Sequence, residues 1–291
     1  MKFNIKILKW ANFYFFVQNL SEWHFSCNHE YNQLWKKELG SFSKQKKNAL
    51  KNFAAIHKKS SFGEKYLGQF FFTKKNPLAF LKNILPQKRY RVVNKVLMLF
   101  AEDFNYIYQK DFPLLMKWKK ILEQHLKNEK LTKQIDKDLA TLYRAKPLHK
   151  DINIYLLFSA PNYTGGGSNI DKKSISLEIS RCSTKKVDEV LGIIWHELIH
   201  LHFEKTYFRN LLKKKILGKK VQKISEATAS SLFPLGVLGK KYFGLQTKRT
   251  LHSLMLSPIH TASLIKISMD YLEAQKSFDE KFIRQVLRII K

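Results

Sequence analysis

The chain has 291 residues, a formal net charge of +30, a hydrophobic content of 44% and 2 cysteines. This composition provides enough apolar material for a core in one large domain or two, and it excludes a disulfide-stapled scaffold. No stretch reaches the length of about 18 apolar residues that a membrane-spanning helix needs, so membrane insertion is not expected. The few, scattered cysteines are typical of a reducing compartment, which predicts a cytoplasmic location.

The large positive charge is typical of proteins that bind a polyanion such as nucleic acid. Lysine supplies most of this charge, and arginine is rare beside it. Specific readers of phosphate and bases favour arginine because its planar group binds two acceptors at once. Nucleic acid is therefore an alternative partner that the sequence does not favour.

The first part of the chain, residues 1–147, predicts a helical N-terminal region. Apolar residues recur at helical spacing along much of it, notably in 88–108 and 112–143, and glycine and proline are scarce there. Pro147 marks the end of this region, so we expect a second domain over residues 148–291.

Two strands are predicted at the start of the second domain, over residues 151–159 and 173–180. The second strand alternates apolar and polar residues, which is the pattern of a half-buried strand. Three consecutive glycines at 165–167 predict a loop between the two strands. Such a loop either borders a substrate cleft or serves as a flexible hairpin connection.

A long helix is predicted next, over residues 184–204, from apolar residues that recur at intervals of three and four. His196, Glu197 and His200 stand within its apolar part in the pattern HExxH. Two imidazoles one helical turn apart, with a carboxylate beside the first, have the geometry that a catalytic zinc needs. The alternative is a pair of hydrogen-bonded core histidines with a solvated Glu197, but buried polar groups without a partner are costly, which favours a metal.

Glu226 is the candidate for a third metal ligand. A second helix is predicted over residues 221–233, and Glu226 is its one carboxylate, among small residues that allow a close approach to the first helix. His202 lies roughly 160° to 200° around the helix from His200, so it cannot join the same metal. Glu204 would have to reach back along the helix, which makes it a poor ligand.

This pattern resembles the zincin superfamily of metallopeptidases, and within it the gluzincins, whose third ligand is a glutamate on a later helix. The resemblance covers Ile175 to about Phe233. The metzincin branch is excluded, because Phe203 and Thr206 occupy the positions of its glycine and third histidine. The resemblance implies a mainly helical α+β fold with a small sheet whose edge strand lies beside the HExxH helix. We expect residues 173–180 to be that strand, with an exposed edge along which an extended peptide can pair.

The resemblance further implies a hydrolase, a zinc metallopeptidase that acts on peptide or protein substrates. Zn²⁺ would be held by two histidines and a glutamate, and Glu197 would take a proton from the water that the metal activates. A second electrophile is expected further along the chain for the oxyanion. Among His252, His260, Tyr242 and Tyr271, we favour His260 and Tyr271 as catalytic residues.

Two alternatives stay open at this point. One is a DNA-associated peptidase like the SprT-type proteases that degrade DNA–protein crosslinks, tethered by the basic surface. That group uses a third histidine shortly after the motif, and none occurs between His202 and His252. The other is a non-enzymatic basic binding protein in which the HExxH segment holds no metal.

Overall fold

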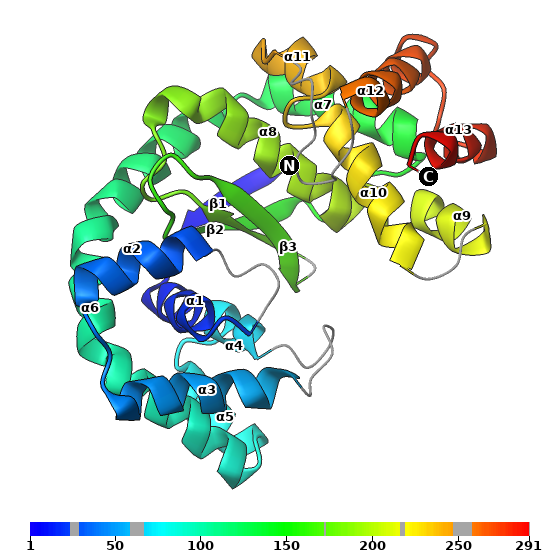
Figure 1. Ribbon diagram of the computed structural model, residues 1–291. Helices are drawn as coiled ribbons and strands as arrows, with labels where there is room; N and C mark the ends of the chain where they lie inside the picture. The colour runs from blue at the N-terminus through cyan, green and yellow to red at the C-terminus, as the bar shows by residue number, and fades with distance from the viewer. Residues whose placement is uncertain (24–28, 59–66, 172, 216–218, 247–257, 291) are drawn as a thin grey trace.

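The computed structural model describes residues 1–23, 29–58, 67–171, 173–215, 219–246 and 258–290. Over these residues the protein has a mainly helical α+β fold with one small mixed sheet, as the sequence predicted (Figure 1). The strands are β1 (Lys2–Lys6), β2 (Asp151–Leu157), β3 (Gly165–Asp171) and β4 (Ser174–Glu178).

The helices before the second strand are α1 (Lys9–Ser21), α2 (His29–Leu39), α3 (Lys44–Lys58), α4 (Gly68–Thr73), α5 (Pro77–Ile84), α6 (Gln87–His125) and α7 (Glu129–Tyr143). Those after the sheet are the short 3₁₀ turn η1 (Thr184–Lys186), α8 (Val187–Leu198), the π-helical turn η2 (Ile199–Phe203), α9 (Tyr207–Lys215), α10 (Lys219–Leu232), α11 (Val237–Phe243), α12 (Pro258–Glu273) and α13 (Glu280–Ile290).

The four strands lie in the order β1-β2-β4-β3, so β4 is a central strand and β3 lies at an edge. β1 and β4 run parallel to β2, whereas β3 runs antiparallel to β4 with Gly166 opposite Leu177. The prediction that residues 173–180 form an exposed edge strand is therefore wrong, and so is the prediction of a loop at 165–167. The three glycines begin the edge strand instead. Because glycine has no side chain, this part of the strand can lie close to a neighbouring helix.

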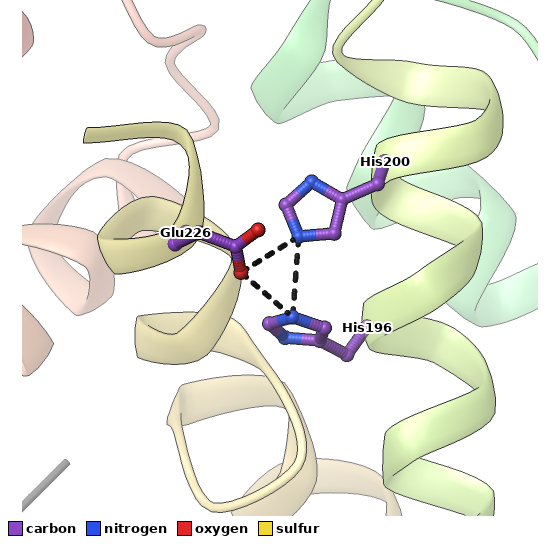
Figure 2. Close-up of side chains that lie close together, drawn as sticks. All are labelled: His196, His200 and Glu226. Carbon is purple, nitrogen blue, oxygen red and sulfur yellow. Dashed lines mark hydrogen bonds and ion pairs between the residues drawn. The ribbon is translucent and has the colours of Figure 1, made fainter. Parts of the chain in front are cut away.

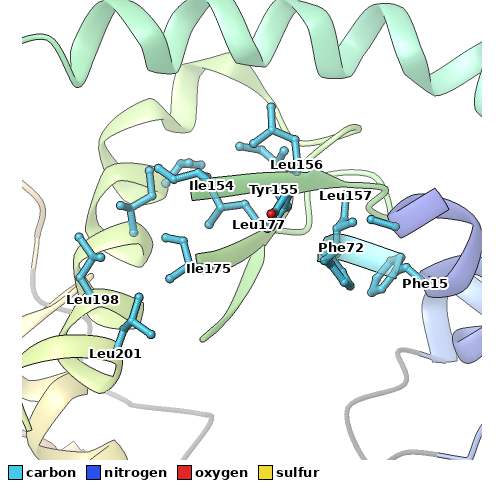
Figure 3. Packing of buried hydrophobic residues seen from close by; sticks show 14 of the residues in the cluster. Phe15, Phe72, Ile154, Tyr155, Leu156, Leu157, Ile175, Leu177, Leu198 and Leu201 are labelled. Carbon is cyan, nitrogen blue, oxygen red and sulfur yellow. The ribbon is translucent and has the colours of Figure 1, made fainter. Parts of the chain in front are cut away.

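Helices cover both faces of the sheet. On one face, Ile154, Ile175 and Leu177 point toward α8 and η2, where Leu198 and Leu201 lie (Figure 3). On the other face, Tyr155 and Leu157 point toward α1 and α4, and the rings of Phe72 and Tyr155 are 5.3 Å apart. Side chains of successive strand residues alternate between faces, so one apolar strand supplies both layers of the core.

The N-terminal strand β1 crosses the boundary that we expected near residue 147. The N-terminal region is helical apart from this strand, which pairs with β2 and was not predicted. On the α8 side of the sheet, the rings of Phe3 and Trp195 meet edge to face at 6.3 Å. The start of the chain therefore supports the helix that carries the HExxH motif.

Helix α6 runs without interruption through Pro113, although proline seldom lies inside a helix. Its buried residues Ile107, Leu115, Trp118 and Leu122 continue one stripe across the proline. Proline inside a helix costs about 3 kcal/mol, which burial of this stripe offsets. None of the helices in the described part of the chain is both long enough and apolar enough to span a membrane.

Candidate metal centre

The HExxH segment occupies the end of α8 and the π-helical turn that follows it. Asp188 and Glu189 lie in the first turn of α8, where acidic residues suit the helix dipole. The i→i+5 pattern is marked by the bond from the Glu204 amide to the Ile199 carbonyl, at 3.1 Å. Single π turns in α-helices are common at functional sites, and here the turn contains His200.

The structure brings His196, His200 and Glu226 together, as the sequence predicted (Figure 2). The two Nε2 atoms lie 3.2 Å apart, and the Oε2 atom of Glu226 lies 3.4 Å from His196 Nε2 and 3.3 Å from His200 Nε2. Ligand atoms on a tetrahedral zinc at 2.0 to 2.1 Å lie about 3.3 to 3.4 Å from one another. The spacing therefore fits a zinc shell with three protein ligands.

Hydrogen bonds on the far side of each imidazole fix which nitrogen faces the cluster. His196 Nδ1 lies 3.0 Å from the Phe233 carbonyl, and His200 Nδ1 lies 3.0 Å from Oε2 of Glu204. A carbonyl and a carboxylate accept hydrogen bonds, so both Nδ1 atoms donate and both Nε2 atoms carry a lone pair when the rings are neutral. Together with Glu226, three acceptors then converge on one point, which calls for a cation.

Close packing around α8 places the Phe233 carbonyl. A β-carbon at Gly192, one turn before His196, would lie 2.7 Å from Pro234 Cβ, so only glycine allows the segment after α10 to pass here. This approach brings Phe233 onto the same face of α8 as His196.

Glu204 stands behind His200 and not in the cluster. Its side chain is only 1% exposed, accepts a short hydrogen bond from Ser225 and lies 3.4 Å from Nε of Arg209. Burial raises the pKa of Glu204, but His200, Ser225 and Arg209 outweigh this effect and lower it below its usual value. Glu204 is thus an ionised orienting group, a role that the sequence did not reveal; its spacing of four from His200 was the available signal.

The pKa values of the cluster reflect the crowding of charges. Burial opposes protonation of His200, but the carboxylates of Glu204 and Glu226 raise its pKa well above the usual value. The imidazoles in turn outweigh burial and lower the pKa of Glu226. Burial raises the pKa of Glu197, and the two imidazoles partly offset this rise. Glu197 therefore sits beside the cluster as a buried carboxyl group and is not one of the three converging residues.

Of the candidate oxyanion residues, Tyr242 lies in α11, and His260 and Tyr271 lie in α12. The Tyr271 hydroxyl donates to Asp279, between α12 and α13, at 2.9 Å. Burial, together with this hydrogen bond, raises the pKa of Tyr271 to about 12. The Tyr242 hydroxyl donates to Asp138 at 2.7 Å. His260 is exposed in the first turn of α12, and His252 lies outside the described residues. The contacts among His196, His200 and Glu226 involve neither His260 nor Tyr271.

His202 points away from the cluster, as the sequence indicated. Its Nδ1 accepts a hydrogen bond from the Leu148 amide at 3.2 Å, and its ring is 5.8 Å from the ring of His149. Burial, with His149 and Lys205 nearby, lowers its pKa to about 4.

A further carboxyl group near the site was not identified from the sequence. Glu178, the last residue of β4, accepts a hydrogen bond from the Tyr31 hydroxyl at 2.7 Å. Burial raises its pKa to about 7, and Glu197 contributes to this rise. Tyr31 comes from α2, so only the folded arrangement reveals the pair.

No known protein family matches the chain, and neither a curated protein nor a solved structure matches it. The geometry of the cluster is therefore the basis for a function.

Proposed function

We propose that this protein is a zinc-dependent metallopeptidase of gluzincin-like design, with His196, His200 and Glu226 as metal ligands. The observation that carries the proposal is the convergence of three acceptor atoms at 3.2 to 3.4 Å from one another. Ring nitrogens with lone pairs and a carboxylate oxygen repel each other unless a cation lies between them. Two histidines and one carboxylate are a set that catalytic zinc uses.

Glu197 is the general base of the proposed reaction. It follows a proposed ligand directly in sequence and stays out of the converging group, so it is available to take a proton. Zinc, when bound, would supply Lewis-acid polarisation of a carbonyl and would lower the pKa of water toward about 7. The outer edge of β3, which no strand of the described chain pairs, would hold an extended peptide beside α8.

The ligand set supports this function over a DNA-associated SprT-type protease, in which a histidine takes the third position. Glu226 fills that position here. The surplus of lysines is a reason to include DNA in an assay, and it names no substrate by itself.

The proposal is tested by peptidase activity before and after removal of metal. We expect the purified protein to cleave extended fluorogenic peptides, to lose activity with a chelator, and to regain it with zinc. Glu226→Ala should abolish activity, whereas Glu129→Gln, at a side chain that is 82% exposed, should not change it. A protein that binds zinc but cleaves no peptide in a broad library, or an active metal-free protein, contradicts the proposal.

A further inference from the structure

The edge strand β3 lies directly against the side chain of Glu197. A β-carbon at Gly166 would lie 2.7 Å from Glu197 Cγ and 3.0 Å from both Glu197 Oε1 and Ile193 Cγ2. Carbon atoms in favourable contact lie about 3.5 to 4.0 Å apart. Any side chain at position 166 would therefore displace the Glu197 side chain, whereas the backbone of Gly166 can lie directly against it.

Ser168 approaches Glu197 from the same strand. It lies two residues after Gly166, so its side chain points to the same face of β3, where its hydroxyl lowers the pKa of Glu197. No lysine or arginine forms an ion pair with Glu197 among the residues that the structure describes. From the side of the sheet, Glu197 therefore meets Gly166 and Ser168 of β3, with the buried carboxyl group of Glu178 in β4 near it.

Resting on the proposed function, we propose that β3 positions the general base: Gly166 provides the surface on which Glu197 rests, and Ser168 holds its carboxylate. Glutamate has several rotatable bonds, so a free side chain would spend much of its time away from the reacting water. A base must lie within about 2.6 to 3.2 Å of the proton that it removes. β3 restricts the side chain of Glu197, and helix α8 holds its backbone.

The same strand would then serve both substrate and base. Its inner edge pairs with β4, and one face carries Gly166 and Ser168 against Glu197. No strand among the described residues pairs with its outer edge, where an extended peptide would bind. A substrate that pairs along β3 would order the element that holds the base, which favours extended peptides over short ones.

The steric contact is tested by a double-mutant cycle on the metal-free protein, monitored by thermal unfolding. We expect Gly166→Ala to lower the midpoint by about 5 °C, because it overpacks the contact with Glu197. In a Glu197→Ala background the same change should cost about half as much or less, with the remainder due to Ile193.

Gly167→Ala is the matched control for this cycle, because Gly167 is adjacent and its β-carbon would meet Ser176 Oγ at 3.3 Å instead. Its effect on the midpoint should be the same in both backgrounds. An equal cost of Gly166→Ala with and without the Glu197 side chain overturns the proposal. This readout needs neither zinc nor peptidase activity, so its failure is distinct from failure of the proposed function.

The proposed contact between Ser168 and Glu197 is tested by kinetics, and this experiment also serves if Gly166→Ala does not fold. Ser168→Ala should lower kcat by about 10-fold or more while KM and zinc content stay unchanged, since the base is misplaced and the substrate edge is intact. Ser168→Thr, which keeps the hydroxyl, should restore most of kcat. An unchanged kcat in Ser168→Ala, with a zinc-loaded and active parent protein, overturns the proposal and leaves the metallopeptidase assignment in place.

Discussion

Two polar clusters in this protein differ in whether their charged and polar groups all find partners within the protein. In the first, the arginine cluster, Arg181 lies 2.9 Å from Asp111 and 2.6 Å from Glu38, and Ser180 donates to Asp111 at 2.6 Å. Each carboxylate of the arginine cluster meets donors from the protein itself. Such a cluster is self-sufficient and stabilises the junction of α6, α2 and the segment after β4.

In the second, the histidine cluster of His196, His200 and Glu226, acceptors face acceptors. The donors of both rings are used on their far sides, by Phe233 and Glu204. When both rings are neutral, three lone pairs meet, so the cluster is completed by a proton or a cation held between them. A polar cluster whose groups are all paired within the protein indicates a structural role. A cluster of converging acceptors, such as the histidine cluster, indicates a site for a ligand.

The largest expected effect concerns stability and lies in the arginine cluster. Arg181→Met leaves Asp111, whose side chain is 1% exposed, without its cation. We expect the free energy of unfolding to fall by about 3 to 5 kcal/mol in urea denaturation, with zinc content unchanged. The control is Lys241→Met, which removes an exposed pair to Asp138 and should cost less than about 1 kcal/mol. Equal effects of the two changes would mean that the arginine cluster is not structural.

The next effect is on catalysis. Glu197→Gln keeps the shape of the side chain but removes the base, so kcat should fall by a factor of at least about 10². Zinc content, measured by metal analysis, should stay unchanged, because Glu197 is not part of the converging group. Loss of zinc in this variant would make Glu197 a ligand and would contradict the assignment of roles.

A smaller effect is expected for the residue that orients His200. Glu204→Gln weakens the hydrogen bond to Nδ1 and removes a negative charge, so zinc affinity should fall by about 10- to 100-fold. Competition with a chromophoric chelator measures this change, with Glu129→Gln as the exposed control. Unchanged affinity would show that Glu204 only fills space behind the ring.

The last prediction concerns the pH dependence of stability at Glu178, whose pKa is raised to about 7 from 4.5. Because the folded state holds this proton more tightly than the unfolded state, the proton's contribution to stability is fully present below about pH 4.5 and is lost as pH rises through about 7. Glu178→Gln does not titrate, so its free energy of unfolding should gain on that of the parent across this pH range, by up to about 3 kcal/mol. If the free energies of unfolding of the two proteins depended on pH in the same way, the raised pKa of Glu178 would be refuted.

The sequence was sufficient to predict that His196, His200 and Glu226 converge, because helical periodicity is local. His196 and His200 share a face by spacing alone, and Glu226 was the one carboxylate of a helix, α10, that the structure also contains. The strand β4 was predicted from its alternation, as was the mainly helical α+β fold.

The order of the strands in the sheet could not be predicted from local sequence patterns. Three glycines predict a turn, but pairing with β4 and contact with Glu197 make Gly165, Gly166 and Gly167 the start of the edge strand. β1 depends on a partner about 150 residues away in sequence, which no short-range signal reports. The hydrogen bond from Tyr271 to Asp279 is likewise a tertiary contact that local sequence patterns do not report.

The zinc content of the purified protein tests the central claim most directly. Metal analysis after incubation with zinc and dialysis should find about one zinc ion per chain in the parent protein and in Arg181→Met, and none in Glu226→Ala. A parent protein without zinc, or a Glu226→Ala variant that retains it with the parent's affinity, would contradict the claim that the histidine cluster is a metal centre.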